Sequence, residues 1–224
     1  MLLGVDLGGT KIEGIVLKSR ENPEKVIRYR VDTEEEKGYS HVINNIKSLV
    51  GYIENKINYK FNRLGIGTPG TIDPDTGFLK NSNSQCLNGM PIKNDLSTIL
   101  DKTILIQNDA NCFALAETVL GSVRDQYPSA KNVFGIIIGT GVGGGVIIEG
   151  KALYGNQGIG GEWGHTIVTD SGDKCYCGKR GCVESVISGR ALQTYYKKIS
   201  GNKLKFEDIY SKKESDEHAK KTLH

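Results

Sequence analysis

The residues from Gly161 to Glu184 hold the clearest set of chemically active side chains in the sequence. His165 is followed by three cysteines, Cys175, Cys177 and Cys182. One imidazole and three thiolates at this spacing match a tetrahedral zinc site. Because four protein ligands leave no open coordination position, we expect a structural zinc ion. Buried reduced thiols beside a satisfied core histidine are the alternative.

The chain between Asp170 and Gly181 is rich in Gly and Lys, with too little apolar content to fold without a metal. Zinc would fix one ring nitrogen of His165, which leaves the other nitrogen able to donate an N–H to a neighbour. Glu162 and Glu184 stand on either side of the cluster, so both are expected near this histidine.

Two glycine turns each join a pair of apolar strands. Gly8-Gly9 lies between strands expected at 2–7 and 10–17, in a hairpin that requires glycine dihedrals, and GTGVGGG (139–145) lies between strands expected at 134–138 and 146–149. Such turns can direct several backbone N–H groups at phosphate oxygens. The candidate phosphate-binding residues are Gly8, Gly9, Thr10 and Lys11 in the first turn and Gly139, Thr140, Gly141 and Gly143 in the second.

Ordinary tight turns are the alternative for either glycine stretch taken alone. Gly139, Gly141 and Gly144 also fit G-x-G-x-x-G, but a dinucleotide fingerprint requires a helix after the loop. The β-branched VIIE predicts a strand there instead. The spacing therefore argues against a dinucleotide site.

Two aspartates stand at strand ends beside these turns. Asp6 precedes the first turn and could hold Mg²⁺, directly or through water, or could cap the turn. Asp109 follows the strand TILIQ (103–107), at the usual place for a side chain presented into an α/β cleft, although Asn and Asp also favour helix N-caps.

The remaining pattern predicts an α/β chain. We expect a strand at 26–31, an amphipathic helix from Ser40, as N-cap, to Lys56, a strand at 63–67, an irregular loop TPGTIDPDTGFLKNSNS, and helices at 94–100, 110–120 and at the end in DEHAKKTLH. Strand, glycine turn and strand occur twice, at 2–17 and 134–149, with a boundary between Leu120 and Asn132. Two similar halves favour a cleft between two lobes.

Composition excludes several classes of protein. The net charge is +3, with 29 Lys and Arg against 26 acidic residues, and no basic stripe argues for nucleic acid. Neither a signal peptide nor an apolar run of about 20 residues is present, so no membrane association is expected. Five cysteines, three of them at metal spacing, suit a reducing cytoplasm.

Six stretches together resemble the ROK family of bacterial sugar kinases and related repressors. They are GVDLGGTKIEGIVL, GIGTPGTIDPDTG, NDANCFALAE, GIIIGTGVGGGVIIEG, GEWGH and CYCGKRGCVES, in family order. KNSNSQCLNGMPI, GEWGH and CYCGKRGC are most similar to the fructokinase (mannofructokinase) branch. The resemblance implies the actin, hexokinase and Hsp70 fold, which has two RNase H-like lobes around a central cleft. The lobes would be 1–120 and 121–224.

The resemblance also assigns roles to residues. Asp109 is implied as the general base, and sugar ligands are implied at Asn83, Asn108, Glu162, His165 and Glu184, with backbone near Gly70. The family's zinc site coincides with His165 and the three cysteines. A homodimer is also compatible with the family, although no feature of the sequence specifies one.

Two departures from the family pattern affect these expectations. Family members continue into a glycine-rich adenosine-binding motif and further helices, whereas this chain ends at His224. We therefore expect an incomplete second lobe, in a fragment or an impaired product. The family's repressors carry a helix-turn-helix ahead of the first strand, and this chain starts on that strand.

The resemblance implies ATP-dependent phosphorylation of a hexose, with D-fructose converted to fructose 6-phosphate as the main expectation. The cofactors would be ATP, Mg²⁺ and structural Zn²⁺. Glucokinase and N-acetylglucosamine or N-acetylmannosamine kinase are alternatives. A sugar-binding regulator without turnover is an alternative from another class.

Overall fold

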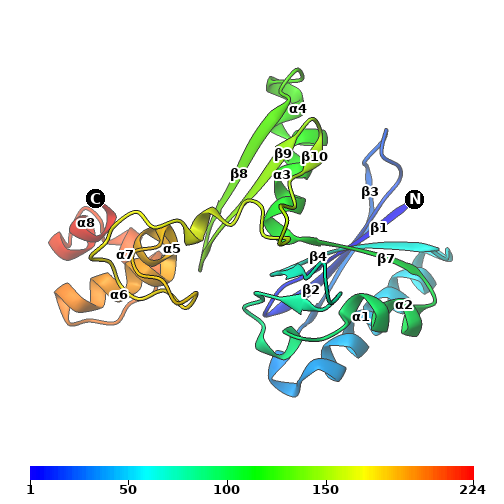
Figure 1. The fold of residues 1–224 in the computed structure, drawn as a ribbon, viewed down its shortest axis with the longest axis horizontal. Coiled ribbons are helices and arrows are strands. Elements are labelled where there is room, and N and C mark those ends of the chain that lie inside the picture. Colours follow the sequence, from blue (N-terminus) through cyan, green and yellow to red (C-terminus); the bar gives the residue numbers. More distant parts are fainter.

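A computed structural model describes residues 1–224 as an elongated molecule. Figure 1 shows three groups of elements along its length: a large sheet with two helices, a narrow sheet with helix α3, and a group of short helices that holds the C-terminus. The narrow sheet lies between the other two groups, so the chain crosses it on the way from one end of the molecule to the other.

The first sheet has five strands in the order β3-β2-β1-β4-β7. Strands β1, β4 and β7 run parallel, while β2 and β3 pair antiparallel to their neighbours. Their bounds are β1 Leu2–Leu7, β2 Lys11–Leu17, β3 Lys25–Asp32, β4 Arg63–Thr68 and β7 Thr103–Asn108. The parallel strands end at one edge of the sheet, where Asp6 and Asn108 lie.

Helices α1 (Tyr39–Ile57) and α2 (Ile92–Leu100) pack with this sheet around the main hydrophobic core. Alternate residues of β1 and β2 are buried, and α1 buries a stripe at helical spacing from Val42 to Ile53, as the sequence predicts. The expected cap at Ser40 is wrong. Helix α1 begins at Tyr39, with Gly38 at the N-cap position, two residues before Ser40, and no side-chain cap.

The connection from β4 to α2 contains regular structure that was not expected. Residues Thr71–Ile72 (β5) pair antiparallel with Leu79–Lys80 (β6), and a 3-10 turn, η2, follows at Gln85–Leu87. Asp73 closes the hairpin, because its carboxylate accepts the N–H groups of Asp75 and Thr76, each at 3.0 Å. Prolines and polar residues thus shorten these strands without abolishing them.

The second sheet consists of β8 (Asn132–Ile138), β9 (Val142–Ile148) and β10 (Lys151–Ala152), all antiparallel. The turn is confined to 139–141, so the expected loop over 139–145 is wrong in its second half. Helix α3 (Asp109–Val119) packs on this sheet and is followed by α4 (Ser122–Gln126). A Cβ on Gly145 would lie 2.4 Å from the Ala110 carbonyl oxygen, so glycine lets the helix approach the strand.

The division into lobes at residue 120 stays a prediction. Helix α3, placed in the first lobe on sequence grounds, contacts β8 and β9 of the second sheet as well as β4 and β7 of the first. It therefore joins the two sheets.

The C-terminal group follows a 3-10 turn, η3, at Trp163–His165. Its helices are α5 (Val183–Ile187), α6 (Gly189–Ser200), α7 (Phe206–Ser211) and α8 (Glu217–Leu223). Tyr196, Ile209 and Ala219 form a small core, and the Tyr196 hydroxyl donates to Asp216 at 2.7 Å. Helix α8 confirms the helix expected in the final residues. None of the helices is both long and apolar enough to cross a membrane.

Candidate functional site

The four expected metal ligands come together. The ligand atoms of His165, Cys175, Cys177 and Cys182 all lie within 4.8 Å of one another. Cys175 Sγ is 3.5 Å from His165 Nδ1, and Cys177 Sγ is 3.6 Å from Cys182 Sγ. Ligands on a tetrahedral zinc ion stand about 3.6 Å apart for nitrogen and sulfur and about 3.8 Å apart for two sulfurs. The cluster therefore fits zinc with little movement.

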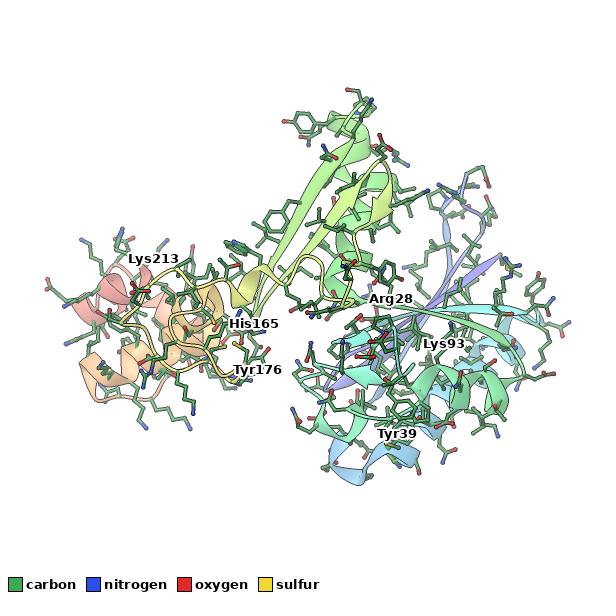
Figure 2. The ribbon with its side chains drawn as sticks, in the orientation of Figure 1. Arg28, Tyr39, Lys93, His165, Tyr176 and Lys213 are labelled. Carbon is green, nitrogen blue, oxygen red and sulfur yellow. The ribbon has the colours of Figure 1, made fainter.

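His165 directs its two ring nitrogens to different neighbours. Nδ1 faces the thiol cluster, while Nε2 lies 3.1 Å from the Tyr176 hydroxyl. Figure 2 shows both side chains at the end of the C-terminal group that faces the first sheet. Zinc on Nδ1 would leave Nε2 as an N–H donor, and the tyrosine oxygen stands where that donor points. Desolvation, with smaller effects from nearby acidic groups, raises the pKa of Tyr176 to about 12.

A cleft of about 1470 Å³ lies between this histidine and the β5–β6 hairpin with the η2 turn that follows it. Its volume exceeds the roughly 300–1,000 Å³ of typical small-molecule pockets, which indicates an open cleft. Glu162 and His165 form one wall, together with Trp163. The polar side chains of the opposite wall include Asn81, Ser82, Gln85 and Asn88.

Asn83, expected as a sugar ligand, does not line this cleft and is exposed. Gln85 and Asn88 were missed on sequence grounds. The 3-10 turn η2 brings them to the wall, and a mixed polar loop gives no periodicity from which such a turn could be predicted.

Asn108 and Asp109 take different places at the start of α3. Asn108 is the N-cap, because its Oδ1 accepts the N–H groups of Ala110 and Asn111, and its Nδ2 donates to the Gly70 carbonyl at 3.2 Å. These bonds hold α3 against the Gly70 loop and leave one Nδ2 N–H without an acceptor in the chain, so the sugar contact expected of Asn108 stays a prediction. Asp109 is the first helical residue and remains accessible.

Asp109 and Asp6 line one cavity of about 970 Å³. Desolvation raises the pKa of Asp109, the Ala110 N–H opposes this shift, and the charge of Asp6 adds to it. Desolvation and the charge of Glu13 raise the pKa of Asp6, against the effect of Arg30. Asp6, 103 residues away in sequence, is therefore close enough to influence the protonation of Asp109.

Glu162, which lines the larger cleft, is close enough to Asp109 for the two charges to interact. Desolvation raises its pKa, His165 opposes the shift, and Asp109 and Glu184 add to it. The site thus contains carboxylates at the ends of β1 and β7 and carboxylates beside the zinc cluster. Like charges of this kind favour cations and hydroxyl donors as ligands.

The two glycine turns have the same pattern of free donors. In the first turn Gly8 N–H donates to Lys11, and in the second Gly139 N–H donates to the Gly141 carbonyl, both at 2.9 Å. The N–H groups of the next residues, Gly9 and Thr10 in the first turn and Thr140 and Gly141 in the second, have no acceptor within the chain. Each turn therefore offers two adjacent N–H groups, the arrangement that binds phosphate oxygens.

Close contacts, rather than backbone dihedrals, accompany Gly8 and Gly141, whereas a Cβ at Gly139 would meet nothing within 4 Å. None of Gly8, Gly9 and Gly141 has a positive φ, so the expectation of a dihedral requirement at Gly8-Gly9 is wrong. A Cβ at Gly8 would stand 3.0 Å from the Lys11 carbonyl oxygen. Gly143, expected to bind phosphate, lies in β9 with its Cα facing Ala110, where a Cβ would be 3.3 Å from the alanine methyl.

Glu184 lies in the first turn of α5, and its Oε2 accepts the Val142 N–H at 2.9 Å. In this structure the expected sugar ligand therefore contacts the second glycine turn. Lys11 is exposed and its ammonium has no partner within the chain.

Comparisons with known proteins agree with this geometry. Residues 2–224 match the sequence model of the ROK family. The chain belongs to the ROK family. Similar ROK relatives include the N-acetyl-D-glucosamine kinase of Vibrio atlanticus, 37% identical over 219 residues, which are 93% of this chain and 70% of that protein. The enzyme of the same name from Vibrio cholerae is 35% identical over 227 residues, covering 97% and 72% of the two chains.

Solved ROK structures share the fold. A ROK hexokinase from Thermus thermophilus superposes with a TM-score of 0.84 at 29% identity, over 99% of this chain and 72% of that one. A ROK family glucokinase from Streptomyces griseus, in complex with glucose and AMPPNP, gives 0.77 at 26% identity, over 99% and 74%. The expected two-lobed α/β ROK fold is confirmed.

Proposed function

We propose that this ROK chain transfers the γ-phosphoryl group of ATP to a hexose, and that N-acetyl-D-glucosamine is its sugar. The observation that carries the proposal is the position of Asp109. Its accessible carboxyl stands at the first residue of α3, in one cavity with Asp6, and that helix packs on the strand that follows the second glycine turn. A candidate base, a candidate cation ligand and a candidate phosphate-binding turn are thus held together through helix α3.

Asp109 would act as the general base. It accepts the proton of the sugar hydroxyl while that oxygen attacks the γ-phosphorus, and the bond to the bridging oxygen of ADP breaks. A carboxylate with a raised pKa is a better proton acceptor than an ordinary one, which suits a hydroxyl that ionises only far above neutral pH.

The glycine turns would bind the nucleotide phosphates. The free N–H pairs at Gly9-Thr10 and Thr140-Gly141 can donate to phosphate oxygens without losing a partner in the chain. Thr10 and Thr140 add hydroxyl donors, and Lys11 adds a positive charge. Asp6 would hold Mg²⁺, which neutralises charge on the transferring phosphoryl group when bound.

Glu162 and His165 would bind hydroxyls on the far side of the sugar from the base. Both line the cleft that separates the zinc loop from Asn81 and Ser82. Zinc at the four-residue cluster fixes the ring of His165 and its tautomer. The ring then presents one donor, Nε2–H, to the cleft.

The choice of sugar depends on the relatives. Curated relatives at 34 to 37% identity are named N-acetyl-D-glucosamine kinases, which supports the alternative stated in the sequence analysis over D-fructose. The fructokinase-like stretches KNSNSQCLNGMPI and CYCGKRGC keep fructose as the competitor.

The test is ADP release with Mg-ATP against N-acetylglucosamine, N-acetylmannosamine, glucose, mannose and fructose. We expect the highest kcat/KM with N-acetylglucosamine. Turnover that favours fructose would overturn the choice of sugar. Sugar binding by calorimetry without turnover on any sugar would overturn the kinase and support the regulator alternative.

A further inference from the structure

We propose that Glu184 is a positioning residue for the second glycine turn, and that it transmits the order of the zinc cluster to that turn. The proposal concerns a role for Glu184 other than contact with a sugar. The predicted effect on nucleotide binding rests on the proposed function. The positioning of the turn by Glu184 does not.

Two hydrogen bonds join the turn to the segment after the zinc ligands. Glu184 Oε2 accepts the Val142 N–H at 2.9 Å, and Gly189 N–H donates to the Gly139 carbonyl at 2.8 Å. One bond is made on each side of the Thr140-Gly141 pair, so both ends of the turn are fixed by residues more than 40 positions later in the chain. A bond to a charged acceptor is about twice as strong as a neutral one.

The turn is also shaped around the carboxylate. A Cβ on Gly141 would stand only 2.5 Å from Glu184 Oε2. Glycine at 141, whose φ is not in the left-handed region, therefore leaves the Glu184 carboxylate room to stand where it does, and a side chain there would displace that carboxylate. The close approach leaves the Gly141 N–H without an acceptor in the chain while fixing the next N–H, that of Val142.

The backbone of Glu184 is positioned by the cluster of His165 and the three cysteines. Cys182 is the N-cap residue of α5, and Glu184 follows two positions later in the first turn of this helix. The Val183 N–H donates to the Thr166 carbonyl at 2.9 Å, and the backbones of Cys182 and Ile167 pair in an isolated antiparallel β-bridge. Thr166 directly follows His165, so a metal that draws Cys182 and His165 together also sets the direction in which α5 starts.

A short helix cannot hold this direction by itself. Helix α5 has five residues, and isolated helices of that length are unstable in water. Its place is therefore defined by the cysteine and histidine cluster on its N-terminal side and by the turn contacts of Glu184, together with its packing against α6 and β9. We expect loss of zinc to weaken the hydrogen bond between Glu184 and the Val142 N–H and so to make the second glycine turn less ordered.

The first measurement is hydrogen exchange at the 139–143 amides. Glu184→Ala should raise the exchange rate of the Val142 amide by about tenfold or more, the effect of losing a hydrogen bond to a charged group. Glu184→Gln keeps an acceptor oxygen and should restore most of the protection. Ser185→Ala is the matched control on α5, because Ser185 donates only to the Cys182 carbonyl. It should leave the 139–143 amides as in the wild type.

Zinc removal from the wild-type chain should raise exchange at the same amides, and added zinc should restore protection. Unchanged exchange in Glu184→Ala would overturn the positioning role. Unchanged exchange after complete zinc removal would overturn the transmission.

The second measurement is the Kd of Mg-ADP without sugar, by calorimetry. Glu184→Ala should weaken binding about tenfold and Glu184→Gln by less than about threefold, because a loosened turn must be ordered on binding. An unchanged Kd in Glu184→Ala would overturn the link to the nucleotide. If the wild-type chain binds no Mg-ADP, the proposed function fails, while the exchange rates still decide the role of Glu184.

Discussion

The Nε2 atom of His165 lies 3.1 Å from the hydroxyl oxygen of Tyr176, on the wall of the cleft opposite the β5–β6 hairpin. The two rings meet edge to face, with centroids 5.1 Å apart. The tyrosine hydroxyl therefore contacts the same ring nitrogen that the proposed function assigns to a sugar hydroxyl.

Removing this competing hydroxyl should strengthen sugar binding. Tyr176→Phe keeps the ring contact but frees Nε2, and we expect KM for the sugar to fall about two- to tenfold with kcat little changed, the range of one neutral hydrogen bond. Steady-state kinetics with N-acetylglucosamine provides the measurement. A higher KM in the variant would show that the tyrosine hydroxyl itself binds the sugar.

Replacing the proposed base should abolish most of the turnover while leaving sugar binding intact. Asp109→Asn preserves the size of the side chain but accepts no proton at pH 7, so kcat should fall about 10²- to 10⁴-fold. Calorimetry should find sugar affinity nearly unchanged. Asp101→Asn is the matched control, because Asp101 is exposed with φ of 53°, a conformation that Asn tolerates well. Retention of most of the kcat in Asp109→Asn would exclude Asp109 as the base.

The pH dependence of kcat/KM should report the raised pKa of Asp109. Desolvation and then the charge of Asp6 shift this pKa upward, so the acid limb should lie at higher pH than for an ordinary aspartate. A base works only when deprotonated, so activity should rise with pH through that value. Asp6→Asn removes one negative charge and should move the limb to lower pH, whatever its effect on the rate. A limb that stays in place in this variant would show that the two carboxyls are not coupled.

Zinc should be bound at about one ion per chain and lost from a cluster variant. Cys177→Ser should lower the zinc content measured by plasma mass spectrometry and lower the midpoint of thermal unfolding, because the loop has little apolar content to hold it. Cys86→Ser, outside the cluster, should keep full zinc content. Equal zinc in both variants would place the metal elsewhere.

Breaking the buried ion pair between Glu54 and Lys102 should lower the free energy of unfolding more than breaking an exposed pair. Glu54 is 5% exposed at its side chain and contacts Lys102 at 2.8 Å, whereas its second partner, Lys60, is 72% exposed. Lys102→Ala should therefore reduce the free energy of unfolding by about 3 kcal/mol, and Lys60→Ala by less than about 1 kcal/mol. Urea unfolding at pH 7 measures both.

The same pair predicts a pH effect with a definite sign. Burial alone raises the pKa of Glu54, but the bonds from Lys102, Phe61 and Lys60 lower it overall. Its contribution is therefore present above the pKa of the unfolded chain and lost as the pH falls through the folded value. The difference between the wild type and Lys102→Ala should narrow in acid, and a constant difference would contradict this account.

Several features follow from short stretches of sequence. The strands of the first glycine hairpin, helix α1 and the grouping of His165 with the three cysteines were all predicted, because each depends on periodicity or spacing within about 20 residues. The zinc ligands in particular lie between positions 165 and 182, so few backbone arrangements can keep them apart once the metal binds.

Other features were decided by contacts between distant residues. The sequence offered Asn108 and Asp109 equally as N-caps or ligands, and only the packing of α3 beside Gly70 makes Asn108 the cap and leaves Asp109 accessible. Likewise, Gly143 and Gly145 were taken for part of a loop. The strand continues through them because α3 lies against them.

The sequence by itself therefore determined most of the local elements, the family and the grouping of His165 with the three cysteines. Only the tertiary structure decided that Asp6 and Asp109 share a cavity, and that Glu184 meets the turn at Gly141. The physical reason is range. Backbone periodicity and metal spacing act between neighbours in the chain, whereas the burial, charge coupling and close approach that complete the site arise when sheets and helices pack together.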